Sequence, residues 1–566
     1  MAEAWRLKAA DETSARGIAA GLGMRGLTAR ILSARGFDSP EGVTRFLTPR
    51  LADLRPPAGM ADLDRAIDRI LRALEKNERV AVFGDYDVDG ITSAAVLVLM
   101  LRALGLDVVA RMAQRASGYG FSPGDAAEFV GQGCTLVLTG DCGTSDHESL
   151  AFCRSRGVDV IVIDHHHVPT GESNAFALLN PHRGDDNFAF KGLASCGVAF
   201  YLAAAVRTRL RADGNPKGDK LEPRTWLDLV ALGTIADLVP LTQENRILVA
   251  AGLRELSTRQ RPGIAALAAV ANLADGLLGT VDVSFRLAPR LNAAGRLGNA
   301  QRALELLLAP DAASANALAA ELDDLNRDRQ RIQERIWLEA SAAAEQWQDH
   351  PTLVLGAEGW HQGVVGIVAA KLVEKFRKPT VVVGFNQGQG RGSARTLGGF
   401  DLYKALSQCE RHLTLFGGHP MAAGVSLLAE NLAAFRDAFA ETGRSHFASY
   451  PQDETVEVDA IATLAELDMV QAEELERLGP FGNANKEPLI VVPGVVAKST
   501  RVVGTSHLQL TLSHGTAVGE AIAFGMGDRN PGQGARLDVI GMAEVDTFRG
   551  QRRIRLRLRH FMRSAS

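Results

Sequence analysis

Three aspartates at alternate positions, Asp85, Asp87 and Asp89, come directly after an apolar run. Gly90 follows them, and the apolar stretch at 91–100 indicates a helix. A strand, a loop and a helix in this order place the acids at the carboxyl end of the strand, the edge where open α/β sheets bind ligands. Three carboxylates this close repel one another unless a cation lies among them. The spacing predicts a site for a hard divalent cation such as Mg²⁺ or Mn²⁺; the alternative is an acidic turn that caps a helix.

Two later apolar runs also end in polar side chains. One ends in Asp141, and the other ends in Asp164 followed by three histidines, of which His165 and His166 are the first two. Helical stretches separate these runs, and strands that alternate with helices predict βαβ units and a parallel sheet. The carboxyl ends of parallel strands meet at one edge, so we expect the acids and histidines to converge there. A lone histidine would be structural, but this combination predicts a metal centre.

A further candidate ligand is Asp237, a single acid at the end of an apolar, helix-like stretch. It could cap the helix, but acids are disfavoured at the C-terminal end of the helix dipole. A buried acid needs a partner, and a metal ion would supply one.

The composition is that of an ordinary globular chain. Its 566 residues exceed one core, so we expect about three or four domains. Hydrophobic residues make up 46% and charged residues 23%, and the net charge of −4 gives no global basic field that would indicate a nucleic-acid partner. The five cysteines form no CxxC pair, the chain does not start with a secretory signal, and no apolar run is long enough to cross a bilayer. We therefore expect a soluble cytoplasmic protein with no membrane partner.

Two short segments carry arginines that could contact a phosphate. The segment at 114–120 contains two glycines, and its candidate contacts are Arg115 and Ser117. The segment at 285–296 is expected to be a short loop, and its candidate contacts are Arg290, Asn292 and Arg296. The alternatives are a flexible surface loop in the first case and a structural loop with solvated arginines in the second.

A long helix and a second α/β segment follow. The stretch from Asp311 to about residue 348 has no Gly or Pro and is rich in Ala, Leu, Glu and Arg, which predicts one helix with Asp311 as its N-cap. Beyond it, glycine-rich loops suit phosphate contact through backbone N–H groups and cationic side chains, although such turns can be purely structural. The candidate residues are Ser393, Arg395, Gly417, Gly418 and His419.

The pattern after residue 450 is that of a β domain. From 553 to 559 arginines alternate with Ile and Leu, which predicts a strand with a buried apolar face and an exposed basic face. Several short strands with a basic stripe suit an OB-fold, a common single-strand binder. The alternative is a β domain with an incidental basic face.

Four ordered motifs, at 85–90, 140–143, 164–166 and 233–240, resemble those of the DHH phosphoesterase superfamily, and the resemblance to its RecJ family runs over most of the chain. The resemblance implies an α/β multidomain protein with a parallel-sheet DHH domain, a connecting helix, a DHHA1 substrate-binding domain and a C-terminal β-barrel OB-like domain. With an N-terminal helical segment, expected to be a packing and lid element, the implied boundaries are 1–75, 76–310, 311–348, 349–450 and 451–566.

The resemblance also implies roles for the metal-centre residues. It assigns one ion to Asp87 and Asp141, and a second ion, which shares Asp141, to Asp89, His165 and Asp237. It leaves open whether Asp85 binds an ion directly or contacts residues that bind it. We expect Mn²⁺, with two ions and with Mg²⁺ as the alternative, because the set is rich in oxygen and lacks thiolates.

The remaining implied roles concern catalysis and substrate. Asp164 would orient His165 through its second ring nitrogen, and His166 would contact the scissile phosphate or assist proton transfer. His419 would lie near the scissile phosphate. The residues that would hold the DNA end are Arg115, Ser393 and Arg395.

The function that the resemblance implies is a metal-dependent exodeoxyribonuclease. It would degrade single-stranded DNA from 5′ to 3′, release 5′ mononucleotides by two-metal hydrolysis, and act in DNA repair and recombination. A single-strand binding protein and a helicase are implied partners. The alternatives are an oligoribonuclease or small phosphoester phosphatase, and a non-catalytic single-strand-binding scaffold.

Overall fold

The computed structural model describes residues 5–115, 118, 120–171, 173–449, 455–504, 506–548 and 551–564, so the candidate Ser117 lies outside the described residues. The chain forms two compact units. We call them the central unit, Pro57–Asp237 with Arg254–Gln452, and the terminal unit, Met1–Pro56 with Leu238–Leu253 and Asp453–Ser566. No helix in the described part of the chain combines the length and apolar character needed to cross a membrane.

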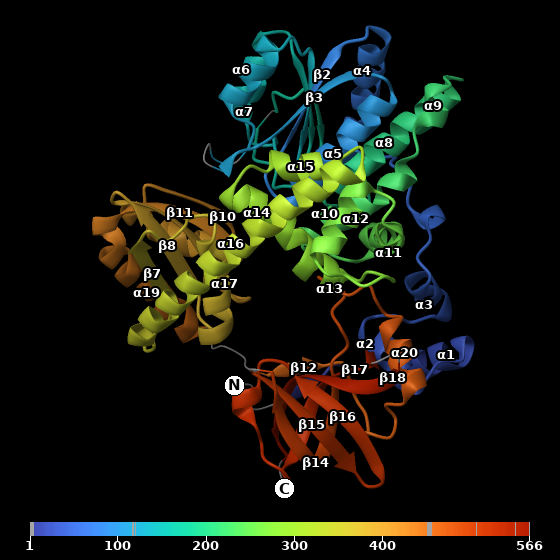
Figure 1. Ribbon diagram of the computed structural model, residues 1–566, viewed down its shortest axis with the longest axis vertical. Helices are drawn as coiled ribbons and strands as arrows, with labels where there is room; N and C mark the ends of the chain where they lie inside the picture. Colours follow the sequence, from blue (N-terminus) through green and yellow to red (C-terminus); the bar gives the residue numbers. More distant parts are fainter. Residues whose placement is uncertain are drawn as a thin grey trace. The chain divides into compact units, whose positions relative to one another are not determined.

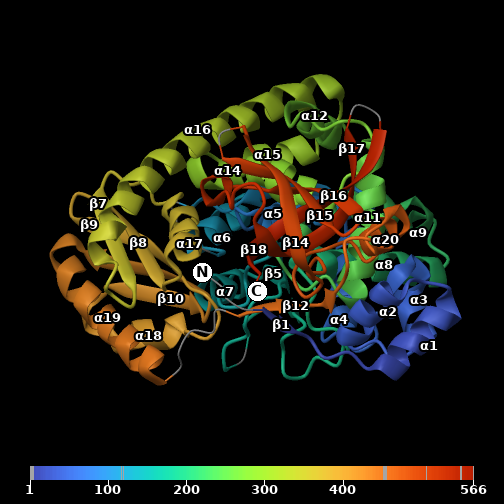
Figure 2. The same cartoon turned by 90° about the horizontal axis from the view of Figure 1, so that it is seen from below.

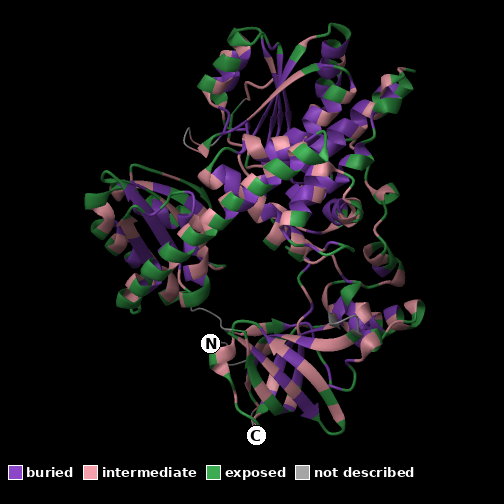
Figure 3. Cartoon of the chain, in the orientation of Figure 1, coloured by how far each residue is buried: buried purple, intermediate pink, exposed green. Residues whose placement is uncertain are grey.

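A parallel sheet organises the first half of the central unit, as the sequence predicted. Its strand order is β3-β2-β4-β5-β6, and every pairing is parallel. The bounds are β2 (Arg79–Gly84), β3 (Asp107–Met112), β4 (Leu136–Gly140), β5 (Asp159–Ile163) and β6 (Ala177–Leu179). Helices cover both faces (Figure 1): α4 (Leu63–Glu75), α5 (Val88–Ala103) and α8 (Ser195–Ala212) on one, α6 (Pro123–Gly131) and α7 (His147–Ser155) on the other. The strands β2, β4 and β5 are almost wholly buried (Figure 3).

A layer of helices follows this sheet. Its members are α9 (Lys217–Lys220), α10 (Leu227–Ala236), α12 (Pro262–Val270), α13 (Thr280–Asp282), the π-helix η4 (Val283–Leu287), α14 (Ala288–Leu297) and α15 (Gln301–Leu307). The expectation of a loop at 285–296 was therefore wrong. Pro289 is tolerated in the first turn of α14, where its missing N–H has no helical partner to lose. Gly295 fits because a Cβ atom there would lie 2.2 Å from the carbonyl oxygen of Tyr86.

The predicted long helix is confirmed as α16 (Ala312–Ala344), and the Asp311 side chain caps it by accepting from the Ser314 N–H at 2.9 Å. It runs from α12 and α15 to α17 (Val365–Phe376) in Figure 2. Beyond it, a second sheet has the order β10-β11-β9-β8-β7, in which only β7 and β8 are parallel. Its remaining elements are β7 (Leu353–Glu358), β8 (Thr380–Asn386), β9 (Gln389–Arg395), α18 (Leu402–Gln408), β10 (Leu415–His419), β11 (Ala422–Leu428) and α19 (Leu432–Ser449).

The terminal unit contains a closed five-stranded barrel, as predicted. Its order is β14-β15-β16-β18-β17, and β17 also pairs with β14 to close it. The parallel pairing of β16 with β18 is the only one among the described barrel strands, and this topology is that of an OB-fold. The bounds are β14 (Ile490–Val503), β15 (His507–His514), β16 (Ala517–Ala523), β17 (Arg536–Phe548) and β18 (Gln551–Arg563), with β13 (Ala460–Ile461) added beside β14.

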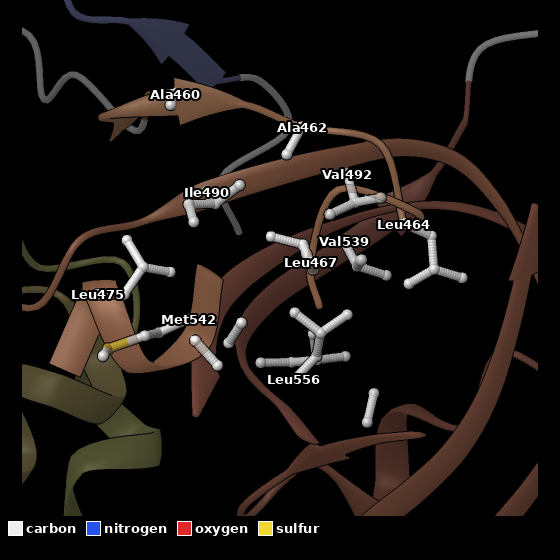
Figure 4. Close-up of a cluster of buried hydrophobic side chains, with 14 of the residues drawn as sticks. Ala460, Ala462, Leu464, Leu467, Leu475, Ile490, Val492, Val539, Met542 and Leu556 are labelled. Carbon is white, nitrogen blue, oxygen red and sulfur yellow. The ribbon is translucent and has the colours of Figure 1, made fainter. Parts of the chain in front are cut away.

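The N-terminal helices share one hydrophobic core with this barrel. The helices are α1 (Glu12–Leu22), α2 (Gly26–Ala34), α3 (Pro40–Leu47) and, from the C-terminal part of the chain, α20 (Met469–Glu476). The core joins Ile18 and Leu32 of the first two helices to Leu475, Val492 and Leu556 of the C-terminal part; Figure 4 shows the last three. Strand β1 (Trp5–Leu7) also pairs with β12 (Val456–Val458), so segments about 450 residues apart in sequence fold together.

The arginine stripe of β18 differs from the expectation. Leu556 and Leu558 are buried, which confirms the predicted apolar face. The basic face, however, is compensated by acids: the strand register brings Glu520, Glu544 and Asp546 beside it, and Glu487 lies before β14. The pairs are Arg553 with Glu520 and Asp546, Arg555 with Glu544 and Asp546, Arg557 with Glu487 and Glu544, and Arg559 with Glu487. The stripe is therefore a ladder of ion pairs and not a free basic surface.

Candidate active site

The parallel sheet brings the predicted acids to one edge. Asp85, Asp141 and Asp164 each directly follow a strand, and each backbone N–H continues the ladder to the neighbouring strand. The acceptors are the carbonyls of Gly140 at 3.1 Å, Ile163 at 2.9 Å and Leu179 at 3.0 Å. Asp141 has a φ of 66°, a left-handed conformation that is costly for a residue with a Cβ atom and that clusters at functional sites.

Two helix N-termini hold the other carboxylates of the edge. Asp87 caps α5 by accepting from the Gly90 N–H at 3.1 Å. Asp89 lies in the first turn of α5 and accepts from the N–H groups of Ser195 at 2.7 Å and Cys196 at 3.0 Å, which begin α8. The Ser195 hydroxyl also donates to Asp141 Oδ1 at 2.9 Å. The sequence reasoning missed Ser195, which lies in none of the motifs considered there.

The candidate ligands form three overlapping groups. Within each group one atom per residue lies within 4.8 Å of the others. The groups are Asp85 with Asp87 and Asp141, Asp89 with His165 and Asp237, and Asp141 with His165 and His166. The structure thus brings together all six residues that were predicted to bind metal: Asp141 joins the first group to the third, and His165 joins the third to the second.

Burial and mutual repulsion perturb these acids. Burial raises the pKa of Asp141 well above its ordinary value, and the charges of Asp87 and Asp89 add to this effect. Burial and the charge of Asp87 have the same effect on the pKa of Asp85. Burial and the charge of Asp89 raise the pKa of Asp237, at the C-terminal end of α10, to about 8. The edge therefore binds protons at neutral pH unless a cation replaces them.

A cation fits the donor set. His165 Nε2 and Asp85 Oδ1 are buried and have no hydrogen-bond partner among the described residues. His165 Nε2 lies 3.4 Å from Asp141 Oδ1 and from Asp237 Oδ2. Ligand atoms about 2.1 Å from one ion lie about 3.0–3.4 Å apart, so these separations suit coordination. Burial lowers the pKa of His165, which keeps its ring neutral as a metal ligand requires.

The role expected for Asp164 requires a correction. Its Oδ1 atom lies 2.8 Å from Nδ1 of His166 and not beside the ring of His165, because the turn after β5 brings the second histidine back over the carboxylate. Burial opposes charge on His166, but the hydrogen bond and charge of Asp164 raise the pKa of His166 to about 9. Burial likewise opposes charge on Asp164, yet His166 holds the pKa of Asp164 well below its ordinary value. The two side chains form a partly buried ion pair beside the candidate ligands, with Asp164 buried and His166 partly exposed.

A cavity of about 1000 Å³ in the central unit carries arginines without acidic partners. Arg115 stacks its guanidinium 4.1 Å from the ring centre of Tyr86 and donates from Nε to the Gly295 carbonyl at 2.9 Å. Arg296 donates to the Gly363 carbonyl at 3.1 Å. Burial and the charges of Arg115 and nearby arginines lower the pKa of Arg296 to about 10. In the described part of the chain no carboxylate lies within ion-pair distance of either arginine, so the cavity attracts anions.

The other substrate candidates divide into two sets. Ser393 and Gly417 line the cavity. Arg395 lies beside Ser393, since both side chains are within 3.4 Å of the position that a Cβ atom of Gly366 would take in the first turn of α17. His361 also lines the cavity, although the sequence reasoning assigned it no role.

Arg290 and Asn292 do not line this cavity. The guanidinium of Arg290 donates to Asp323 at 2.8 Å and to backbone carbonyls, which is a structural role. Gly418 is also absent from the lining, and a Cβ atom there would lie 2.6 Å from the Ala422 carbonyl oxygen. His419 ends the exposed strand β10, and partial burial together with the charges of His166 and His167 lowers the pKa of His419.

The parallel sheet with its acidic edge, the second sheet and the barrel define a DHH family protein with a DHHA1 domain. The model of the DHH family N-terminal domain matches residues 79–234, that of the DHHA1 domain matches 349–443, and that of the RecJ OB domain matches 458–560.

The chain belongs to the RecJ family. It is 33% identical over 563 residues to the single-stranded-DNA-specific exonuclease RecJ of Bacillus subtilis, and the alignment covers 98% of this chain and 70% of the relative. It is 36% identical to RecJ of Dickeya dadantii, over 94% of this chain and 95% of the relative. The crystal structure of RecJ in complex with Mn²⁺ from Thermus thermophilus superposes with a TM-score of 0.85 at 31% identity, over all of this chain and 80% of the other.

Proposed function

We propose that this chain is a metal-dependent exonuclease that degrades single-stranded DNA from its 5′ end and releases 5′ mononucleotides. The names of its relatives support the activity, and the polarity follows the family resemblance. The observation that carries the proposal is the presence, within one unit, of a cluster of candidate metal ligands and of a cavity with Arg115 and Arg296, which have no carboxylate within ion-pair distance among the described residues. The reaction would serve DNA repair and recombination in the cytoplasm, with a single-strand binding protein and a helicase as partners on the same resemblance.

The metal site would hold two divalent ions. Asp85, Asp87 and Asp141 would hold one, and Asp89, His165 and Asp237 would hold the other, with Asp141 shared as the family resemblance implies; the clustering of these side chains supports the assignment. We propose Mn²⁺, with Mg²⁺ as the alternative, because the donors are mostly oxygens and because the structures of RecJ from Thermus thermophilus contain Mn²⁺ in one case and Mg²⁺ in another. When bound, such ions activate water for attack at phosphorus and neutralise the charge that develops on the phosphate oxygens.

The protein side chains would bind the phosphate and handle protons. Asp164 keeps His166 charged, so His166 can donate a hydrogen bond or a proton to an oxygen of the scissile phosphate. His419 would contact the same phosphate from β10. The residues that would bind the terminal phosphate are Arg115, Arg296, Ser393 and Arg395, and the stacking of Tyr86 on Arg115 fixes the first of these.

The test uses long single-stranded DNA labelled at either end, with Mn²⁺ and with chelator. Early loss of the 5′ label as a mononucleotide, abolished by chelator, is the expected result. Early loss of the 3′ label would keep the phosphoesterase but refute the assigned polarity and the terminal-phosphate residues. No release by protein that binds the strand would favour a non-catalytic scaffold, and preference for short RNA or pyrophosphate would favour the phosphatase alternative.

A further inference from the structure

The terminal unit contains a second cavity, of about 820 Å³. Four segments line it: the N-terminal segment from Lys8 to Arg55, the start of α11 (Gln243–Thr258) with Arg246, Asp459, and the turn at 484–486. The cavity shares no lining residue with the cavity of the central unit. Its volume is that of a small-molecule site.

Arg246 is the unusual residue of this cavity. Only 3% of it is exposed, yet no described carboxylate lies within ion-pair distance. Its guanidinium lies 3.7 Å from the ring centre of Phe46, Nε donates to the Phe46 carbonyl at 2.8 Å, and Nη2 donates to the Gly479 carbonyl at 2.6 Å. Nη1 has no hydrogen-bond partner among the described residues. A buried cation without an anion is costly, so the surroundings favour an anionic ligand.

The acids of the cavity do not compensate this charge, because each is already paired. The pairs are Glu244 with Arg55 at 2.7 Å, Asp459 with Lys8 at 3.0 Å and Asp53 with Arg50 at 2.8 Å. Arg45 and Lys486 stand at the exposed rim, and among the described residues neither has a carboxylate within ion-pair distance. The cavity therefore has a net positive field with a buried source and two cations at its mouth.

The remaining walls suit an organic ring. Phe37 and Phe46, with ring centres 4.9 Å apart, and Pro49 give apolar surface. The side-chain carbonyl of Gln243 accepts from Arg55 at 2.9 Å, and its NH₂ group is a donor in the same wall. A ligand with both a ring and an anionic group matches these walls better than an inorganic anion does.

We propose that this cavity is a binding site for a nucleoside phosphate, with the phosphate toward Arg246, Arg45 and Lys486 and the base against the aromatic wall. Binding here is separate from the exonuclease reaction, because no residue of the metal centre or of the central cavity lines it.

The test is calorimetric titration of the full chain with dAMP and with ADP, in chelator and without DNA. Inorganic phosphate and adenosine serve as partial ligands. The decisive variant is the double change Arg45→Glu with Lys486→Glu, since both residues are exposed and the fold should persist. The controls are Arg16→Glu, an exposed arginine of the same unit outside the cavity, and Arg391→Glu, which alters the central cavity.

We expect the wild type and both controls to bind a nucleotide, adenosine and phosphate alone to bind more weakly, and the double variant to lose about tenfold or more in affinity. The double variant should keep wild-type exonuclease activity. Absence of nucleotide binding by the wild type would overturn the proposal. So would binding that is lost in Arg391→Glu and kept in the double variant, because the nucleotide would then occupy the central cavity. Neither result bears on the exonuclease, since the titration contains no DNA or metal.

Discussion

Replacing Ser195 with alanine tests how the protein holds Asp141, the proposed shared ligand. Ser195 is fully buried, and its hydroxyl donates to Asp141 Oδ1 at 2.9 Å. Alanine keeps the backbone N–H that donates to Asp89 and removes only the hydroxyl. A hydrogen bond to a charged group contributes about 1.5–3 kcal/mol, which corresponds to a factor of about 10–150 in affinity. Without the hydroxyl, the Asp141 carboxylate is held less firmly and is harder to ionise, so Mn²⁺ affinity should fall by that factor.

The assay is Mn²⁺ titration by calorimetry, followed by exonuclease rates over a range of Mn²⁺ concentrations. The loss of rate should be largest at low metal and should shrink as metal saturates the variant. Ser149→Ala is the matched control, because Ser149 is also buried in the central unit and donates its hydroxyl to the Phe121 carbonyl, away from the metal centre. Wild-type Mn²⁺ affinity in folded Ser195→Ala, or an equal loss in Ser149→Ala, would refute the reasoning.

Three other changes test separate parts of the molecule. Asp141→Ala should reduce turnover by orders of magnitude while the strand still binds, as measured by rate and by fluorescence anisotropy; near-normal turnover would contradict its role as shared ligand. In chelator the melting temperature should fall as the pH rises from 6.5 to 9. The reason is that folding raises the pKa of Asp237 to about 8 and that of His166 to about 9, and such groups lose their stabilising contribution as the pH rises through those values. Mn²⁺ should reduce the fall, and a flat profile in chelator would contradict the raised pKa values. Arg557→Met removes the cation that Glu487 and Glu544 share and leaves each with one arginine, Arg559 and Arg555 respectively. It should lower the free energy of unfolding by about 2 kcal/mol in urea titration, and an unchanged midpoint would show that Arg557 contributes nothing.

The cluster of candidate metal ligands was predictable because its signal is local. Each acid follows an apolar run, and parallel strands bring such ends to one edge whatever the loops between them do. Asp85, Asp141 and Asp164 therefore met in the structure as their strand positions required. The long helix α16 was equally predictable, since both of its signals, the helix-favouring composition and the Asp311 cap, lie within the same short stretch of sequence.

What the sequence could not indicate depends on partners far along the chain or on a single backbone turn. The helices α1 and α2 pack against α20 and the barrel, and no local pattern in either part of the sequence indicates this contact. Whether Asp164 meets His165 or His166 is decided by the turn after β5, and one residue of difference changes which ring is charged. The acids opposite the β18 arginines are scattered over three segments, so only the strand register shows that they neutralise the stripe.

That neutralisation changes where the negative charge of a DNA strand should be bound. A phosphate that approaches Arg557 must compete with Glu487 and Glu544, which already accept from its guanidinium. Among the described residues, a phosphate that approaches Arg115 or Arg296 competes with neutral carbonyls. Its charge would offset the burial and the repulsion from nearby arginines that lower the pKa of Arg296. Replacing the present hydrogen-bond partners of an arginine by a phosphate is therefore more favourable in the cavity of the central unit than on β18. Arginine content predicts anion binding only after the internal carboxylates have been assigned to their partners.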